Sequence, residues 1–230
     1  MSTSTRDEPF AGDKKDGMSV LGPYEKTLIA YLAPKVPEWI NTALLTYTTL
    51  LWSGLVVLCC YLAATVDITW LIGASIAIFM QWLTDCLDGA VGRLRDTGLV
   101  KWGYYMDHFL DFVFLCSIMY GYTIMLPTEQ QYLGFWVQTL CSMIMVNSFL
   151  GFATTNRFKI AWFGIGPTEI RIGFILVNIF LMIFGLSALS LAMPWAVALG
   201  IIVTLAVVWR NGRMIWRLDE AEKGTKILRK

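Results

Sequence analysis

The 230-residue chain carries little charge. Asp, Glu, Lys and Arg make up 15% of it, whereas hydrophobic residues make up 57%. A soluble domain of this length needs more polar surface than that. The formal net charge is only +1, and no basic stripe with interleaved aromatic residues occurs, which excludes a nucleic-acid partner. The composition therefore indicates an integral membrane protein.

The sequence also lacks the thiol patterns of a zinc site. Its five cysteines form no Cys-x-x-Cys pair, and with one histidine in the chain they form no His/Cys cluster. All five lie in or beside apolar runs, which is typical of packing residues. Residues 1–20 are polar and predict a disordered cytoplasmic tail, with no cleavable signal peptide.

Long apolar runs predict an all-α, polytopic membrane protein with six transmembrane helices. Most runs approach the ~20 residues that cross the hydrocarbon core, and Pro127 and Pro194 are placed in short connections. We expect spans at residues 43–66, 68–91, 103–126, 131–155, 171–192 and 194–210. Residues 23–34 mix apolar and charged positions and predict a short N-terminal interfacial helix. The expected division is a 21–40 interfacial amphipathic segment, a 41–212 catalytic membrane domain and a 213–230 cytoplasmic tail.

The basic residues predict the orientation. All 18 Lys and Arg residues fall before the first span, at or after the end of the sixth, in the connections after the second and fourth spans, or, for Arg171, at the start of the fifth. The other connections carry none. The positive-inside rule then places both termini in the cytoplasm, and an odd number of spans would break this partition.

Two of the predicted spans carry ionisable side chains in their interiors: Asp85, Asp88, Asp107, His108 and Asp111. Charge at membrane depth is costly and usually marks a functional site. By helical spacing, Asp85 and Asp88 share one face, and Asp107 and Asp111 share another. Because a short connection joins the two spans, we expect four carboxylates to converge near the cytoplasmic ends.

Four clustered negative charges repel one another strongly in a low dielectric. Either several of these carboxyl groups are protonated, or cations neutralise them. Hard oxygen ligands suit magnesium, with manganese and calcium as alternatives. Two divalent ions would balance the negative charge of four carboxylates, as in a two-metal phosphoryl-transfer site.

Arg93 and three glycines accompany the aspartates. Arg93 is a cation suited to phosphate oxygens, although the positive-inside rule alone could explain it. Gly89, Gly92 and Gly103 would let a ligand approach the backbone closely, or let helices pack tightly.

The segment from Asp85 to Asp111, DCLDGAVGRLRDTGLVKWGYYMDHFLD, resembles the signature of the CDP-alcohol phosphotransferase family, class I. Gly92 stands where the signature has alanine, and nine residues rather than eight separate Arg93 from Gly103. Residues 37–46 also resemble the start of that family's first membrane helix. The matched positions are Asp85, Asp88, Gly89, Arg93, Gly103, Asp107 and Asp111.

The resemblance implies transfer of a phosphatidyl or phosphoalcohol group from a CDP-linked donor to an acceptor hydroxyl, with release of CMP. It implies that the four aspartates hold two divalent cations and that Asp111 is also the general base. Contacts to the CDP donor are implied for Gly89, Arg93 and Gly103, with Thr46 in the nucleotide pocket. One substrate is a lipid, and a homodimer is implied, with the site facing the cytoplasm (of the inner membrane, if the source is a bacterium).

Residues 157–171 and the Asp107–His108 pair are similar in outline to the aminoalcohol phosphotransferases of that family. The histidine-bearing segment which those enzymes place before this region is absent from residues 149–155. Each of these residues also has a structural explanation: a hydrogen-bonding histidine, positive-inside charge, or an acid at a helix start. The candidate acceptor-binding residues are His108, Arg157, Lys159, Glu169 and Arg171.

A competing function is an ion- or proton-coupled transporter, because buried acids also mark such pathways. Against it, the acids gather at one membrane edge beside Arg93, and no charges continue across the other spans. The sequence leaves open whether the donor is CDP-diacylglycerol or a CDP-aminoalcohol.

Overall fold

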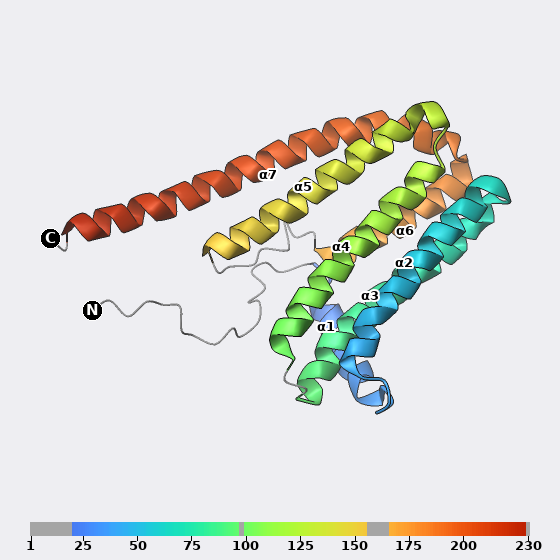
Figure 1. Ribbon diagram of the computed structural model, residues 1–230. Coiled ribbons are helices and arrows are strands. Elements are labelled where there is room, and N and C mark those ends of the chain that lie inside the picture. Colours follow the sequence, from blue (N-terminus) through green and yellow to red (C-terminus); the bar gives the residue numbers. More distant parts are fainter. Residues whose placement is uncertain (1–19, 97–98, 156–165, 229–230) are drawn as a thin grey trace.

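The computed structural model describes residues 20–96, 99–155 and 166–228, and its regular structure within these ranges is entirely helical (Figure 1). The α-helices are α1 (Gly22–Leu32), α2 (Thr42–Thr65), α3 (Leu71–Leu94), α4 (Val100–Ile124), α5 (Gln131–Thr155), α6 (Pro167–Phe184) and α7 (Ser187–Leu228). Short 3-10 turns at Ala33–Lys35, Ile68–Trp70 and Thr128–Gln130 follow α1 and precede α3 and α5. The expected tail at residues 1–20 lies outside the described residues apart from Val20.

Five helices are long and apolar enough to cross a membrane: α2, α3 with its preceding turn, α5, α6 and α7. The chain is therefore a multi-pass membrane protein. Helix α4 is equally long at 25 residues, but Asp107, His108 and Asp111 lower its hydropathy. That α4 forms a sixth span stays a prediction.

The boundary between the last two helices differs from the expected one. Helix α6 ends at Phe184, and Gly185 has a φ of 83°, a left-handed conformation that glycine adopts at little cost. Pro194 lies inside α7, so the expected connection at Pro194 was wrong. A membrane helix tolerates such a proline because neighbouring groups can satisfy the freed carbonyl.

Helix α7 has 42 residues, a length of roughly 63 Å at ~1.5 Å per residue. The hydrocarbon core is only ~30 Å thick. The residues expected as a C-terminal tail, 213–230, continue this helix as far as Leu228.

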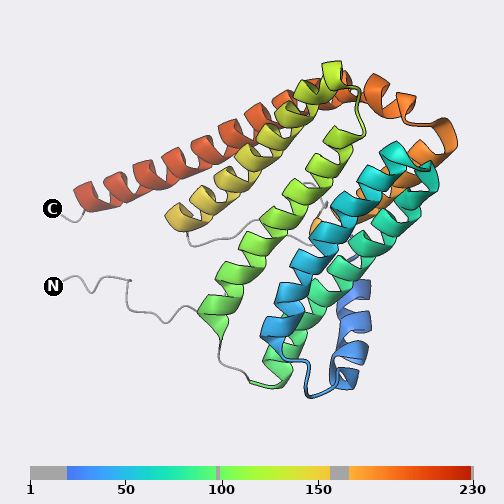
Figure 2. The ribbon, with the colours of Figure 1, turned by 45° about the vertical axis from the view of Figure 1, so that its right-hand side comes forward.

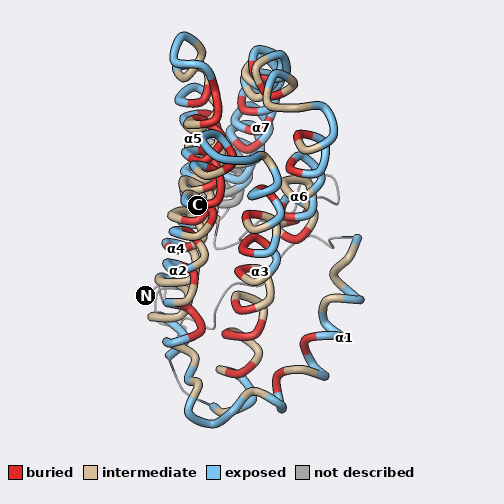
Figure 3. Tube along the Cα trace, turned by 90° about the vertical axis from the view of Figure 1, so that its right-hand side faces the viewer, coloured by how far each residue is buried: buried red, intermediate tan, exposed pale blue. Residues whose placement is uncertain are grey.

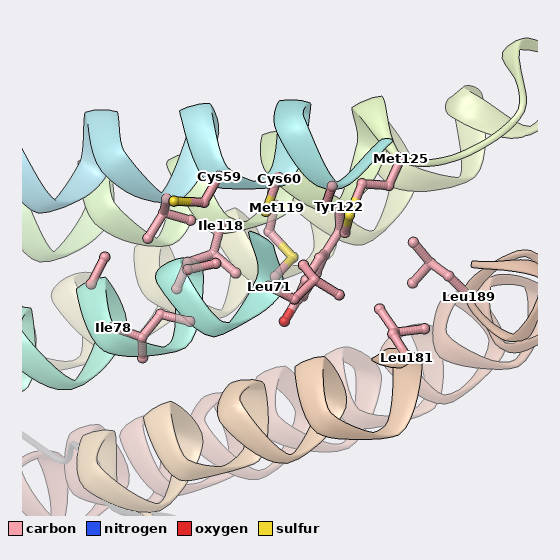
Figure 4. Close-up of a cluster of buried hydrophobic side chains, with 14 of the residues drawn as sticks. Cys59, Cys60, Leu71, Ile78, Ile118, Met119, Tyr122, Met125, Leu181 and Leu189 are labelled. Carbon is pink, nitrogen blue, oxygen red and sulfur yellow. The ribbon is translucent and has the colours of Figure 1, made fainter. Parts of the chain in front are cut away.

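The helices form two groups. Helix α2 packs along both α3 and α4, and α6 packs against α3. Helices α5 and α7 lie side by side and diverge from α4 and α6 toward the C-terminal end of α7 (Figures 1 and 2). The main core joins α2, α3, α4 and α6 through Cys60, Leu71, Ile78, Ile118 and Leu181 (Figure 4).

Close helix contact explains one glycine in α5. A Cβ placed on Gly134 would lie 2.1 Å from Oγ1 of Thr123 in α4, whereas a Cβ on Gly54 would meet nothing within 4 Å. We therefore expect Gly134→Ala to lower the melting temperature of the detergent-solubilised protein and Gly54→Ala to leave it near wild type. Equal melting temperatures for the two variants would contradict this packing.

The N-terminal segment is attached to the end of the bundle at which α3 ends and α4 begins. Ile29 and Ala33 pack with Leu87 and Val91 of α3, and Figure 3 shows buried positions along α1. The guanidinium of Arg95 donates to the carbonyl oxygens of Ile40, Val36 and Pro37 at 2.6, 2.7 and 3.2 Å. The helix expected near residues 23–34 is present, and its position on the membrane surface stays a prediction.

Candidate active site

Three of the four predicted aspartates come together between α3 and α4. Asp85, Asp107 and Asp111 each offer a carboxylate oxygen, and these oxygens all lie within 4.8 Å of one another. The side chains of Asp107 and Asp111 are 32% and 30% exposed, whereas that of Asp85 is 17% exposed. The cluster is therefore open on the α4 side.

Asp88 lies almost one turn beyond Asp85 on α3 and is buried. Its Oδ2 accepts a hydrogen bond of 2.8 Å from Oγ1 of Thr46 in α2. Thr46 was expected in the nucleotide pocket, and the structure places its hydroxyl on this carboxylate. Asn41 caps α2 by accepting from the Leu44 amide at 2.7 Å, which fixes the helix start one turn before Thr46.

Arg171 of α6 reaches into the cluster. Its Nη2 lies 3.0 Å from Oδ2 of Asp85 and 2.6 Å from Oδ1 of Asp111. The residue is only 8% exposed. The predicted acceptor-binding arginine is thus a buried counter-charge for two of the predicted metal ligands.

Gln81 completes this network, and the sequence analysis did not identify it. Its Oε1 accepts from Nε of Arg171 at 2.8 Å, and its Nε2 donates to Oδ1 of Asp111 at 3.3 Å. Gln81 is fully buried. A signal was available, because Gln81 precedes Asp85 by four residues and shares its helix face.

Contacts at the start of α6 position Arg171. Oγ1 of Thr168 donates to Oε2 of Glu25 in α1 and accepts from Nε1 of Trp82 at 3.2 Å. The carboxylate of Glu169 accepts from the backbone amides of Gly166 and Leu21 at 2.8 and 3.0 Å. The candidate acceptor residue Glu169 therefore caps its own helix and ties it to the N-terminal segment.

A second group of buried polar side chains, centred on Asn178, fixes the register of α6 farther along the bundle. Asn178 is fully buried, accepts from the Tyr122 hydroxyl at 2.9 Å and donates to Oγ of Ser75 at 3.0 Å. These bonds join α6 to α4 and α3. Because Asn178 follows Arg171 by seven residues, it lies on the same helix face.

The residues expected at the CDP donor lie at the ends of α3 and α4. Arg93 is exposed, and its Nη1 would lie 3.3 Å from a Cβ placed on Gly89. A Cβ on Gly103 would meet nothing within 4 Å, so packing within the described residues does not require a glycine there. Arg157 and Lys159 lie outside the described residues.

His108 lies beside the cluster. Its Nδ1 is 3.3 Å from Oδ2 of Asp107. The imidazole packs against the rings of Tyr104 and Phe149, with centroid distances of 4.4 and 6.0 Å. This geometry suits a residue that orients Asp107.

The donor set fits divalent cations. It consists of carboxylate oxygens, the ligands that magnesium and manganese prefer. Within the described part of the chain, Oδ1 of Asp85 and Oδ2 of Asp111 have no hydrogen-bond partner, so each is open to a metal ion or a proton. Arg171 offsets only one of the four negative charges.

Comparisons with known proteins agree with this chemistry. An 85-residue segment is 34% identical to "Inner membrane protein YnjF" of Escherichia coli (strain K12), and the match covers 36% of the chain and 39% of that protein. No solved structure matches the chain. A family model described as CDP-alcohol phosphatidyltransferase matches residues 39–209, which contain all four aspartates, Gln81 and Arg171, and the chain therefore belongs to this family of membrane transferases.

Proposed function

We propose that the protein transfers a phosphatidyl or phosphoalcohol group from a CDP-linked donor to an acceptor hydroxyl and releases CMP. The observation that carries this proposal is the meeting of the Asp85, Asp107 and Asp111 carboxylates within 4.8 Å, inside the segment that matches the family. An ion- or proton-coupled transporter is not favoured, because the family match supports transferase chemistry.

In this proposal Asp85, Asp88, Asp107 and Asp111 hold two divalent cations, with magnesium as the expected ion. Bound divalent cations would neutralise negative charge on the diphosphate and on the transferring phosphoryl group. Thr46 keeps Asp88 in place through its hydrogen bond. His108, whose Nδ1 lies 3.3 Å from Oδ2 of Asp107, orients that carboxylate.

Asp111 is the proposed general base. The acceptor oxygen forms a bond to phosphorus, the bond from that phosphorus to the oxygen of CMP breaks, and the hydroxyl proton moves to Asp111. Oδ1 of Asp111 accepts from Arg171 and Gln81, whereas Oδ2 has no hydrogen-bond partner among the described residues. The second oxygen is therefore the one suited to take the proton.

Gly89, Arg93 and Gly103 form the proposed CDP subsite. The open space at Gly103 and the guanidinium over Gly89 leave room for a nucleotide and supply a cation for it. Acceptor contacts are proposed for His108, Glu169 and Arg171 and for the undescribed Arg157 and Lys159. We further propose that the site faces the cytoplasm, that one substrate is a lipid and that the enzyme is a homodimer.

The direct test is a lipid product analysis. Purified protein is incubated with magnesium and a panel of CDP-alcohols and acceptors, including CDP-diacylglycerol with soluble alcohols and CDP-aminoalcohols with lipid alcohols. A new phosphodiester product with stoichiometric CMP is expected for one combination. In parallel, CDP plus magnesium should raise the melting temperature, and the absence of both effects would contradict the proposal.

Arg93→Lys should weaken CDP binding about tenfold, because lysine keeps the charge but loses the planar fork that pairs with phosphate. The measurement is CDP affinity by calorimetry at saturating magnesium. Arg95→Lys is the matched control: it should lower the melting temperature, because Arg95 holds main-chain carbonyls, but keep normal CDP affinity. Unchanged CDP affinity in Arg93→Lys would make Arg93 a positive-inside residue only.

A further inference from the structure

Arg171 contacts two of the carboxylates that the proposed metal site also uses. Its Nη2 contacts Asp85 and Asp111 together, at 3.0 and 2.6 Å. Both aspartates are proposed metal ligands. A guanidinium and a divalent cation bound to the same two carboxylates repel each other, so each weakens the binding of the other.

We propose that Arg171 is an exchangeable counter-ion. In the metal-free protein it pairs with Asp85 and Asp111; when a divalent cation binds, its guanidinium leaves these carboxylates and binds a phosphate oxygen of the nucleotide. This inference rests on the proposed function, because it requires the aspartates to bind metal and the site to bind CDP.

The contacts of Arg171 suit such an exchange. Its Nε is held by Oε1 of the fully buried Gln81 at 2.8 Å, so the stem is fixed close to the guanidinium. Among the described residues Nη1 has no hydrogen-bond partner. Nη1 is therefore free to bind an anion, and rotation about the Cδ–Nε bond, with release of the Gln81 bond, would turn Nη2 from the carboxylates toward it.

The surroundings provide a place for that anion. The side chains of Asp107 and Asp111 are each about one-third exposed, at 32% and 30%, so the cluster is accessible from the α4 side. Guanidinium groups bind phosphate oxygens bidentately. Exchange would keep Arg171 paired in both states, which matters because an unpaired buried charge is strongly destabilising.

The exchange hypothesis and a purely structural role for Arg171 predict different effects on metal affinity when Arg171 is removed. Pairing with Arg171 lowers the apparent metal affinity, because only the fraction of molecules with free carboxylates can bind metal. Removal of Arg171 should therefore tighten metal binding but weaken nucleotide binding. A structural arginine would weaken both when removed, since the cluster would lose its geometry.

The experiment measures Mn²⁺ affinity of the full-length, detergent-solubilised protein by electron paramagnetic resonance, and CDP affinity at saturating Mn²⁺ by calorimetry. For Arg171→Gln we expect Mn²⁺ binding roughly tenfold tighter and CDP binding roughly tenfold weaker, within the usual range of coupling between sites. Arg171→Lys keeps the charge, so its Mn²⁺ affinity should stay near wild type. Arg213→Gln, on the exposed face of α7, controls for the loss of one positive charge and should change neither affinity.

Gln81→Leu provides a second, independent variant. It keeps Arg171 but removes the hydrogen bond that holds Nε, so Mn²⁺ should bind severalfold tighter than to wild type, with a smaller effect than in Arg171→Gln. This variant decides the question if Arg171→Gln does not fold. Weaker or unchanged Mn²⁺ binding in the folded variants would overturn the exchange alone, whereas a wild-type protein that binds no Mn²⁺ would overturn the proposed metal site as well.

Discussion

Removal of divalent cations is expected to reduce turnover by about 10³-fold or more, since stabilisation of transferring phosphoryl charge by metal ions amounts to several kcal/mol and each ~1.4 kcal/mol is tenfold in rate. The structural reason is the excess of negative charge. Arg171, which contacts Asp85 and Asp111, offsets one of the four negative charges of the aspartates. The remaining negative charge would repel the diphosphate of the donor.

The measurement is product formation after dialysis against chelator, with residual metal quantified, followed by addition of single metal ions. Magnesium should restore full turnover and manganese much of it. Calcium should bind yet restore less, because its looser coordination misplaces the phosphate. A cooperative thermal unfolding transition retained after dialysis would show that the fold survives, even at a lower melting temperature. Full turnover at verified zero metal would refute the two-metal mechanism.

The positions of the aspartates could be predicted because they depend on local periodicity. Spacings of three and four residues place carboxylates on one helix face in any α-helix. The short connection from α3 to α4 then makes the two faces meet. These spacings predicted that four carboxylates converge, and the structure brings the oxygens of three of them, Asp85, Asp107 and Asp111, within 4.8 Å of one another. Asp88 is not in this group.

The network around Arg171 could not be predicted in the same way, because it depends on how α6 packs. Gln81 and Arg171 are 90 residues apart in sequence, and their contact requires the register that Thr168, Asn178 and Glu169 fix. From the sequence alone, Arg171 was grouped with the cytoplasmic charges. The packing of α6 against α3 instead buries it.

The break between α6 and α7 shows a similar limit. Pro194 and Gly185 are both residues that can end a helix, and the connection was expected at the proline. Of the two, Gly185 is where the chain turns, in a left-handed conformation with φ of 83° that glycine adopts at little cost. A proline eight residues into a membrane helix costs less when neighbouring groups satisfy the freed carbonyl.

Asp111→Asn and Asp88→Asn are expected to separate the proposed general base from a residue that only binds metal. Asparagine at position 111 keeps the size and shape of aspartate, and its oxygen can still accept from Gln81, as Oδ1 of Asp111 does now at 3.3 Å, and weakly ligate a metal ion. Its amide nitrogen then replaces Oδ2, so the side chain cannot accept the proton. Turnover should fall by ~10²–10⁴-fold, the usual contribution of a positioned base, while donor affinity stays near wild type.

Asp88→Asn should lose donor binding as well as turnover. Its oxygen can still accept from Thr46, as Oδ2 does now at 2.8 Å, so the local helix packing is preserved. The negative charge that would hold metal and, through it, the diphosphate is lost. Asp88→Asn removes charge from the candidate span α3, and Asp111→Asn removes it from the predicted span α4, so both variants should insert normally.

Donor affinity and single-turnover rate, measured side by side at saturating magnesium, distinguish the two roles. A base variant binds donor normally and reacts slowly, because the missing interaction exists only while the proton moves. A variant that has lost a metal-binding side chain binds the donor poorly, in the ground state as well as in the transition state. If Asp111→Asn lost donor binding as completely as Asp88→Asn, Asp111 would be one more metal ligand, and the proton would have to leave the acceptor by another route. Asp107 would then be the next residue to test, since His108 lies 3.3 Å from its carboxylate and could accept a proton passed through it.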